Sequence, residues 1–111
     1  MEKLEIRKMK MEDIPWAAAV EKENFSAPWK EDSFREALEK KENIYLIALI
    51  DGQRAGYIGM WTVLDEGEIT QVSVRKEYQG MHIGRSLMEA LEEEGRKAGV
   101  ASFFLEVRKS N

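Results

Sequence analysis

Several residue types that build catalytic or membrane sites are scarce in this sequence. It contains no cysteine and one histidine, His82. Disulfides, thiolate metal sites and a cysteine nucleophile are therefore excluded, and a lone histidine without H-E-x-x-H spacing builds no metal cluster. No apolar run approaches the roughly 18 residues that span a bilayer, and the first residues lack the apolar core of a signal peptide. We expect a cytoplasmic protein with no metal and no membrane contact.

Basic charge is also outweighed, with 17 lysine and arginine residues against 21 aspartate and glutamate residues. The two signs are interleaved, whereas a nucleic-acid-binding protein concentrates basic residues on one face. Nucleic acid is therefore not an expected partner. With 111 residues, of which 43% are apolar and 34% charged, the chain matches a single globular domain over residues 1–111.

Hydrophobic periodicity predicts eight helices and strands along the chain. Helical spacing predicts three helices, over Met11–Phe25, about Lys30–Lys40, and His82 or Ile83 to Ala98. Alternating or β-branched runs predict five strands, over Leu4–Arg7, Ile44–Ile50, Ala55–Leu64, Glu68–Val74 and Ser102–Val107. Turns are expected at Asp51-Gly52 and Asp65-Glu66-Gly67, and a polar loop at Arg75–Gly80.

This order predicts an α/β (α+β) fold with a mixed, mostly antiparallel sheet. Strands joined by tight turns pair antiparallel, whereas the last two strands flank a helix and should be parallel with a right-handed crossover. Both faces of Ala55–Leu64 are apolar, which predicts a central strand covered on both sides.

The strand–loop–helix unit from Ile69 to Gly99 contains a candidate anion site. A helix N-terminus presents unpaired backbone N–H groups and the positive end of the helix dipole. Gly80 and Gly84 remove side chains that would keep a phosphate from that backbone, and Arg85 or Gln79 could add donors. The alternative is a strand-to-helix turn in which glycine only relieves strain. The glycine spacing matches neither a P-loop nor a dinucleotide fingerprint.

Gln79 to Gly84 resembles the Q/R-x-x-G-x-G/A loop of the GNAT superfamily of acetyl-CoA-dependent N-acetyltransferases. The preceding I-T-Q-V-S-V-R-K-E-Y-Q and the following helix to Gly99 are similar to its neighbouring elements. S-A-P-W-K-E-D-S-F (Ser26–Phe34) and L-E-V-R-K-S-N (Leu105–Asn111) are similar to the ribosomal-protein-alanine N-acetyltransferases, which modify a protein N-terminus. The resemblance covers nearly the whole chain. It implies the GNAT fold, acetyl-CoA as co-substrate and a protein N-terminus, such as that of a ribosomal protein, as acceptor.

The resemblance also implies the cofactor contacts. The pantetheine arm pairs with strand backbone where a bulge separates two strands, at Val72, Ser73 and Val74. The pyrophosphate contacts lie in the loop, at Gln79, Gly80, Met81, His82, Ile83, Gly84 and Arg85, and Asn111 also contacts the cofactor. His82 stands where the family pattern has its first glycine. It is either an exposed residue with little role or a phosphate donor.

The acceptor amine attacks a thioester only when deprotonated, so a general base is useful. Glu106 is the favoured base, because it is a lone acid among apolar residues and because the resemblance assigns the base to the glutamate of L-E-V-R. The alternative is a structural ion pair with Arg108. Glu68 is a second base candidate, Thr70 also faces the amine on this hypothesis, and Trp29 lines either the peptide groove or the core. Without cysteine, direct transfer in a ternary complex is expected.

The family pattern continues after L-E-V-R-x-S-N with further elements and a tyrosine that protonates the CoA thiolate. The resemblance therefore implies that residues 1–111 form an incomplete domain with weak turnover. We expect an uncovered strand at Ser102–Val107 and a homodimer or strand exchange through it. The alternative functions are a non-catalytic acyl-CoA-binding or interaction module and an acetyltransferase for small amines.

Overall fold

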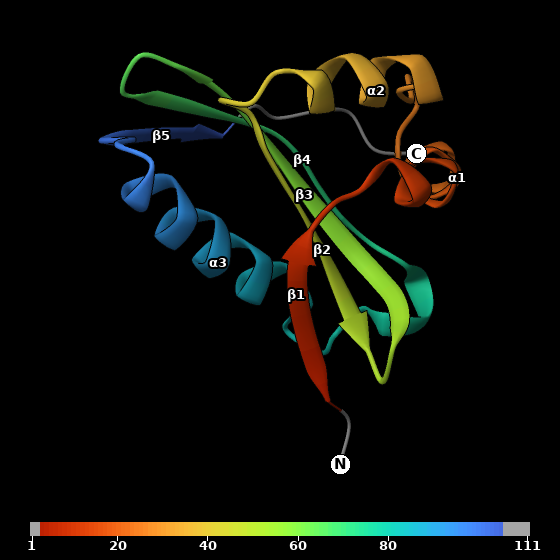
Figure 1. The fold of residues 1–111 in the computed structure, drawn as a ribbon. Helices are drawn as coiled ribbons and strands as arrows, with labels where there is room; N and C mark the ends of the chain where they lie inside the picture. The colour runs from red at the N-terminus through yellow and green to blue at the C-terminus, as the bar shows by residue number, and fades with distance from the viewer. Residues whose placement is uncertain (1–2, 106–111) are drawn as a thin grey trace.

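A five-stranded sheet forms the centre of the computed structural model, which describes residues 3–105 (Figure 1). The strands lie side by side in chain order: β1 (Leu4–Lys8), β2 (Ile44–Ile50), β3 (Gln53–Val63), β4 (Glu66–Val74) and β5 (Ser102–Leu105). Neighbours from β1 to β4 pair antiparallel, and β4 pairs with β5 in parallel. The predicted mixed α/β sheet is confirmed, including its single parallel pair.

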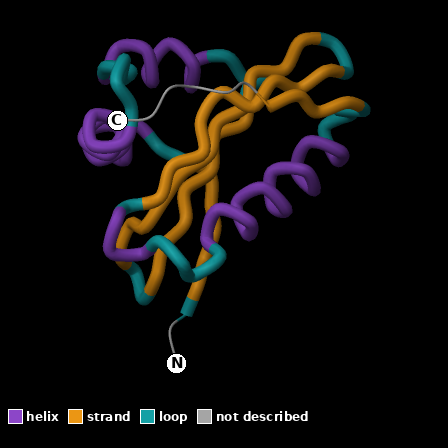
Figure 2. Tube along the Cα trace, turned by 180° about the vertical axis from the view of Figure 1, so that it is seen from behind, coloured by secondary structure: helices purple, strands orange, loops and turns teal. Residues whose placement is uncertain are grey.

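Helices cover both faces of the sheet. One face carries α1 (Ile14–Asn24) and α2 (Glu31–Glu39), and the other carries α3 (Ile83–Lys97), as Figures 1 and 2 show. Two short 3-10 helices, η1 (Met11–Asp13) and η2 (Lys76–Tyr78), precede α1 and α3. The sequence prediction placed one helix from residue 11 and a plain loop before α3. Because Pro15 has no N–H to donate, it sits in the first turn of α1, after η1.

Two apolar clusters hold these layers together. Between the sheet and α3, the buried side chains include Ile58, Ile83, Leu87 and Leu91. The cluster on the opposite face has aromatic residues at its centre, where the Phe34 and Tyr57 rings meet edge to face with centroids 5.7 Å apart. Each large side chain buried in this way contributes roughly 1.5–3 kcal/mol, so both helical layers are fixed to the sheet.

The two hairpin turns differ in how well the sequence predicted them. Asp51 and Gly52 both have positive φ, 50° and 82°, as a two-residue hairpin turn of the predicted kind requires. The next turn is at Leu64 and Asp65, because Val63 already pairs with Glu66. The prediction of a turn through residue 67 was wrong. Gly67 is buried within β4, and a Cβ there would overlap the Met60 sulfur.

β3 is only partly the covered central strand that its sequence predicts. Residues 55–60 are buried, whereas Trp61 and Val63 are 43% and 69% exposed. The two apolar clusters reach no further along β3 than Met60, so the apolar residues beyond it face solvent. This exposed end of the strand lies beside the candidate site.

Candidate functional site

A β-bulge interrupts β4 at Thr70. Gly59 pairs with Gln71 and the next residue of β3, Met60, pairs with Ile69, so Thr70 is the extra residue. Within residues 3–105, β4 pairs with β5 from residue 66 to residue 69, where Ile69 lies opposite Leu105, the last described residue. From the bulge to Val74, no described strand occupies this edge of β4. An extended amide-bearing ligand can therefore pair with the strand there.

The N-terminus of α3 lies at the end of this open edge. Its first helical hydrogen bond runs from the Ser86 N–H to the His82 carbonyl, at 3.1 Å. The N–H groups of residues 83–85 precede that bond and have no partner inside the helix. Among the described residues no side chain caps them. Together with the helix dipole, these free donors make the helix end a candidate anion site.

The glycines of the loop leave space in front of this helix end. A Cβ at Gly80 would meet nothing within 4 Å, and one at Gly84 would meet only Val72 Cγ1, at 3.9 Å. The space is a hollow of about 380 Å³ lined by Val74, Tyr78, Gln79, Gly80, His82, Ile83, Gly84 and Arg85. The hollow reaches the end of β4 at Val74, and Gly84 faces Val72 of the same strand. This combination fits a cofactor with a diphosphate and a peptide-like arm.

Predicted loop residues contribute in different ways. Met81 and Ile83 pack their side chains against the α3-side core, so only their backbone is available. The Gln79 amide nitrogen donates to the Val74 carbonyl at 3.1 Å and ties the loop to the end of β4. Arg85 is exposed beside the helix N-terminus and has no ion pair among the described residues. Arg85 is therefore the side chain best placed to add a positive charge.

His82 adopts a left-handed backbone conformation, with φ +61° and ψ +23°. Glycine adopts this conformation at little cost, which explains why the family pattern has glycine at this position. The side chain is exposed at the rim of the hollow. Histidine is therefore accommodated sterically, at the cost of backbone strain.

The bulge also carries a group of polar side chains. Thr70 and Gln71 are buried and hydrogen-bonded to each other, and the Tyr45 hydroxyl lies 3.5 Å from Thr70 Oγ1. The Gln71 side-chain nitrogen is buried without a partner in the described part of the chain. A buried donor left open at a bulge is suited to a carbonyl oxygen of a bound ligand. On the α1 side, Asn24 donates to the Ser73 hydroxyl, so Ser73 offers a ligand its backbone.

Trp29 follows α1 in the loop that leads to α2. The backbone N–H of Trp29 donates to the buried carboxylate of Glu21 at 3.1 Å, and Glu21 also accepts from the Tyr57 hydroxyl. Its ring lies 5.9 Å from the Trp61 ring and 6.4 Å from the Tyr45 ring, centroid to centroid. Trp29 is half-buried and its ring packs against the core of this face, while its place in a peptide groove stays a prediction.

Two further predicted residues lie outside the described residues, namely Glu106 and Asn111. Glu68 is exposed and lines a separate hollow of about 370 Å³ with Trp61 and Phe104. Sequence reasoning missed Tyr45, Gly59 and Gln71. The available signal was Gly59 itself, because a glycine inside an apolar strand often marks a close approach or a bulge.

The residues that the structure describes include no group of three or more His, Asp or Glu side chains arranged to hold a metal ion. Within the same residues, no helix is both long enough and apolar enough to cross a membrane.

Comparison with known proteins identifies the family. The profile of the acetyltransferase (GNAT) family matches residues 9–111. A Bacillus subtilis protein, named as a candidate ribosomal protein bS18-alanine N-acetyltransferase, is 37% identical over 98% of this chain and 73% of its own length. The Escherichia coli K12 ribosomal protein bS18-alanine N-acetyltransferase is 35% identical over 96% of this chain and 71% of its own length.

Solved structures agree. The crystal structure of the Escherichia coli ribosomal-protein-S18-alanine N-acetyltransferase has a TM-score of 0.86 at 31% identity, covering 98% of this chain and 70% of that one. A Thermoplasma acidophilum N-acetyltransferase crystallised with coenzyme A shares the fold, with a TM-score of 0.75 at 21% identity over 95% of this chain and 79% of that one. The chain belongs to the acetyltransferase (GNAT) family and is an acetyl-CoA-dependent N-acetyltransferase.

Proposed function

We propose that this protein acetylates the N-terminal α-amino group of another protein, with ribosomal protein bS18 as the first candidate acceptor. The named activities of the Escherichia coli and Bacillus subtilis relatives support this acceptor. The observation that carries the proposal is that the uncapped N-terminus of α3 lies beside the part of β4, from the bulge to Val74, that no described strand occupies. We also propose that the sheet and its helical layers act as one acetyltransferase domain.

The proposed contacts with acetyl-CoA lie along β4 and at the N-terminus of α3. The backbone of Val72, Ser73 and Val74 pairs with the amides of the pantetheine arm. The backbone N–H groups from Gly80 to Arg85 bind the diphosphate, with the Arg85 guanidinium adding charge. Asn111, outside the described residues, is proposed as a further cofactor contact. Gly80 and Gly84 support this arrangement, because both line the hollow and neither has a side chain that would fill it.

The acceptor amine approaches the bulge from the side of Trp29 and Thr70. Acetyl-CoA supplies a thioester that an unprotonated amine attacks directly. An α-amino group titrates near ~7.7–8.0, so a base need only collect a proton that is already weakly held. We propose Glu106 as that base, directly or through water. The exposed Glu68, next to Trp61, is the second candidate.

The outer edge of β5 supports a proposal about assembly. Phe104 and Leu105 are 53% and 60% exposed, and among the described strands β5 has only β4 as a neighbour. An open strand edge with apolar side chains invites pairing with another strand. We therefore propose that two copies of this chain associate through β5.

Acetyl transfer is tested with hexapeptides that begin with alanine. One peptide has a free N-terminus and the matched control is blocked by Nα-acetylation. We expect release of the CoA thiol, and a mass gain of one acetyl group on the first residue, with the free peptide only. Binding of CoA by calorimetry without transfer to any amine would favour a non-catalytic binding module. Transfer to small amines but to no peptide would overturn the choice of acceptor.

A further inference from the structure

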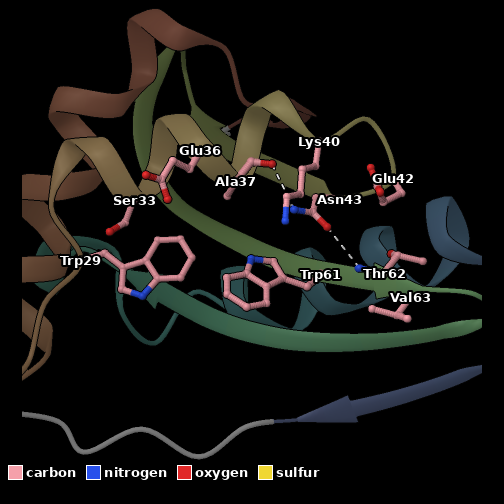
Figure 3. A pocket seen from close by; sticks show the side chains of 10 residues that line it. All are labelled: Trp29, Ser33, Glu36, Ala37, Lys40, Glu42, Asn43, Trp61, Thr62 and Val63. Atoms are coloured by element: carbon pink, nitrogen blue, oxygen red, sulfur yellow. Dashed lines mark hydrogen bonds between the residues drawn. The ribbon is translucent and has the colours of Figure 1, made fainter.

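A pocket of about 410 Å³ lies between α2 and the exposed end of β3 (Figure 3). Its walls include the rings of Trp29 and Trp61, and its rim includes Glu36, Lys40 and Glu42. Neither the cofactor nor the reacting amine uses this pocket in the proposed function. It shares Trp29 with the side of the bulge from which the acceptor approaches in that proposal, so an acceptor chain bound there would lie next to the pocket.

The aromatic walls are held in place by the surrounding structure. The Trp61 indole nitrogen donates to the Tyr45 hydroxyl at 3.0 Å, which fixes the orientation of that ring. The Trp29 ring packs edge to face on Phe34 with centroids 5.3 Å apart. The two indoles are tilted by 40° to each other, with centroids 5.9 Å apart. Figure 3 shows the two side chains next to each other among the residues that line the pocket.

The end of the pocket near β3 is also held by hydrogen bonds. Asn43 donates through its amide nitrogen to the Ala37 carbonyl at 3.1 Å and accepts from the Thr62 N–H at 3.2 Å. These bonds connect the C-terminal turn of α2 to β3 and so fix the spacing between the helix side and the strand side of the pocket. The pocket is therefore part of the folded framework.

The rim has two acidic groups and one basic group. Glu36 and Glu42 have no ion pair among the described residues. In contrast, Glu31 and Asp32 of α2 both pair with Arg35. Glu36 and Glu42 line the same pocket as the two indole rings, and this combination favours a cation with a planar head that also tolerates apolar contact. A guanidinium stacks on an indole and donates to carboxylates at the same time, whereas an ammonium is more strongly hydrated and stacks less well.

We infer that the pocket between α2 and β3 binds an arginine side chain of the acceptor polypeptide, downstream of its acetylated terminus. This inference rests on the proposed function, because it assumes a peptide acceptor. The guanidinium lies against Trp29 and Trp61 and pairs with Glu36 or Glu42. The positive charge of Lys40 repels the guanidinium, and this repulsion weakens the preference for arginine.

The test uses alanine-initiated hexapeptides in a neutral background, with arginine or its uncharged analogue citrulline at one position from two to six. We expect kcat/KM to be about three- to tenfold higher for arginine at one of these positions. The KM for acetyl-CoA should not change. Equal kcat/KM for arginine and citrulline at every position would overturn the inference while leaving N-terminal acetylation intact.

Variants of the exposed rim separate charge from shape. The double variant Glu36→Gln, Glu42→Gln should lose most of the arginine preference, and Lys40→Gln should increase it. Circular dichroism checks that each variant folds. A preference that survives the double variant would place the cation elsewhere. If no peptide is acetylated, the proposed function fails separately, and calorimetric binding of the arginine and citrulline peptides in the presence of CoA still tests the pocket.

Discussion

The hydroxyl of Tyr45 lies 3.5 Å from Thr70 Oγ1, although β3 separates the strands that carry these two residues. The Tyr45 ring crosses β3 above Gly59, where a Cβ would overlap the ring. The same hydroxyl accepts the Trp61 indole N–H at 3.0 Å. One side chain thus ties three strands together at the bulge and connects the proposed acetyl-transfer point to the wall of the α2–β3 pocket.

Gly59→Ala should destabilise the fold by about 1–3 kcal/mol, because the added methyl group overpacks a filled position against the Tyr45 ring. Urea unfolding measures the loss. The control is the Tyr45→Ala background, where the ring is gone and the cost of Gly59→Ala should fall. An equal cost in both backgrounds would show that the two residues are not coupled.

His82→Gly should leave CoA binding unchanged or tighter and should raise the free energy of unfolding by roughly 1 kcal/mol, because glycine adopts the positive φ of residue 82 without strain. Calorimetry with CoA and urea unfolding measure the two effects. Gly80→Ala is the opposite control, since it places a side chain at φ +87° and should destabilise. A clear loss of CoA affinity in His82→Gly would instead identify His82 as a phosphate donor.

Asp13 should make the fold sensitive to acid. Burial alone would raise the pKa of its carboxyl, but hydrogen bonds from Arg7, from the Lys10 N–H and from Arg54 lower this pKa from 3.8 to about 2. A lowered pKa stabilises the fold at pH values above that of the unfolded carboxyl. This contribution, about 2 kcal/mol, is lost as the pH falls from about 4 through 2.

Urea unfolding from pH 7 to pH 2.5 tests this dependence. Asp13→Asn should be less stable at pH 7, because it leaves the guanidinium groups of Arg7 and Arg54 without their carboxylate. It should also lose less stability on acidification than the unsubstituted protein. Parallel pH curves for the two proteins would exclude Asp13 as the source.

Glu106→Gln should lower the rate of acetyl transfer at pH 7 by on the order of 10²-fold or more, if Glu106 collects the proton of the attacking amine. The matched variant is Glu68→Gln, which removes the second candidate base. Thiol release from acetyl-CoA measures both rates. An unchanged rate in Glu106→Gln together with a large loss in Glu68→Gln would reassign the base to Glu68.

Phe104→Lys should convert associated protein to monomer, because a charge on the exposed side of β5 opposes strand pairing between copies. Light scattering over a range of protein concentrations measures the change. The control is Glu93→Lys on α3, which alters charge away from β5. A monomer in the unsubstituted protein would contradict the proposed association.

Local patterns in the sequence determined much of the framework. The turn at Asp51-Gly52 was predictable because both residues tolerate positive φ, and α3 was predictable because its apolar residues recur at helical spacing. The backbone N–H groups without a helical partner at the start of α3 were also predictable, since the first turn of any helix leaves such groups. These features depend only on residues near one another in the chain.

Only the tertiary structure decided how distant residues meet. Trp29 and Trp61 come from different elements, and nothing in either local sequence indicates that their rings form one pocket. The turn at Leu64 likewise escaped prediction, because Gly67 is required for packing on Met60 and not for the turn. Such features depend on strand register and on close packing between layers, which emerge only when the whole sheet has formed.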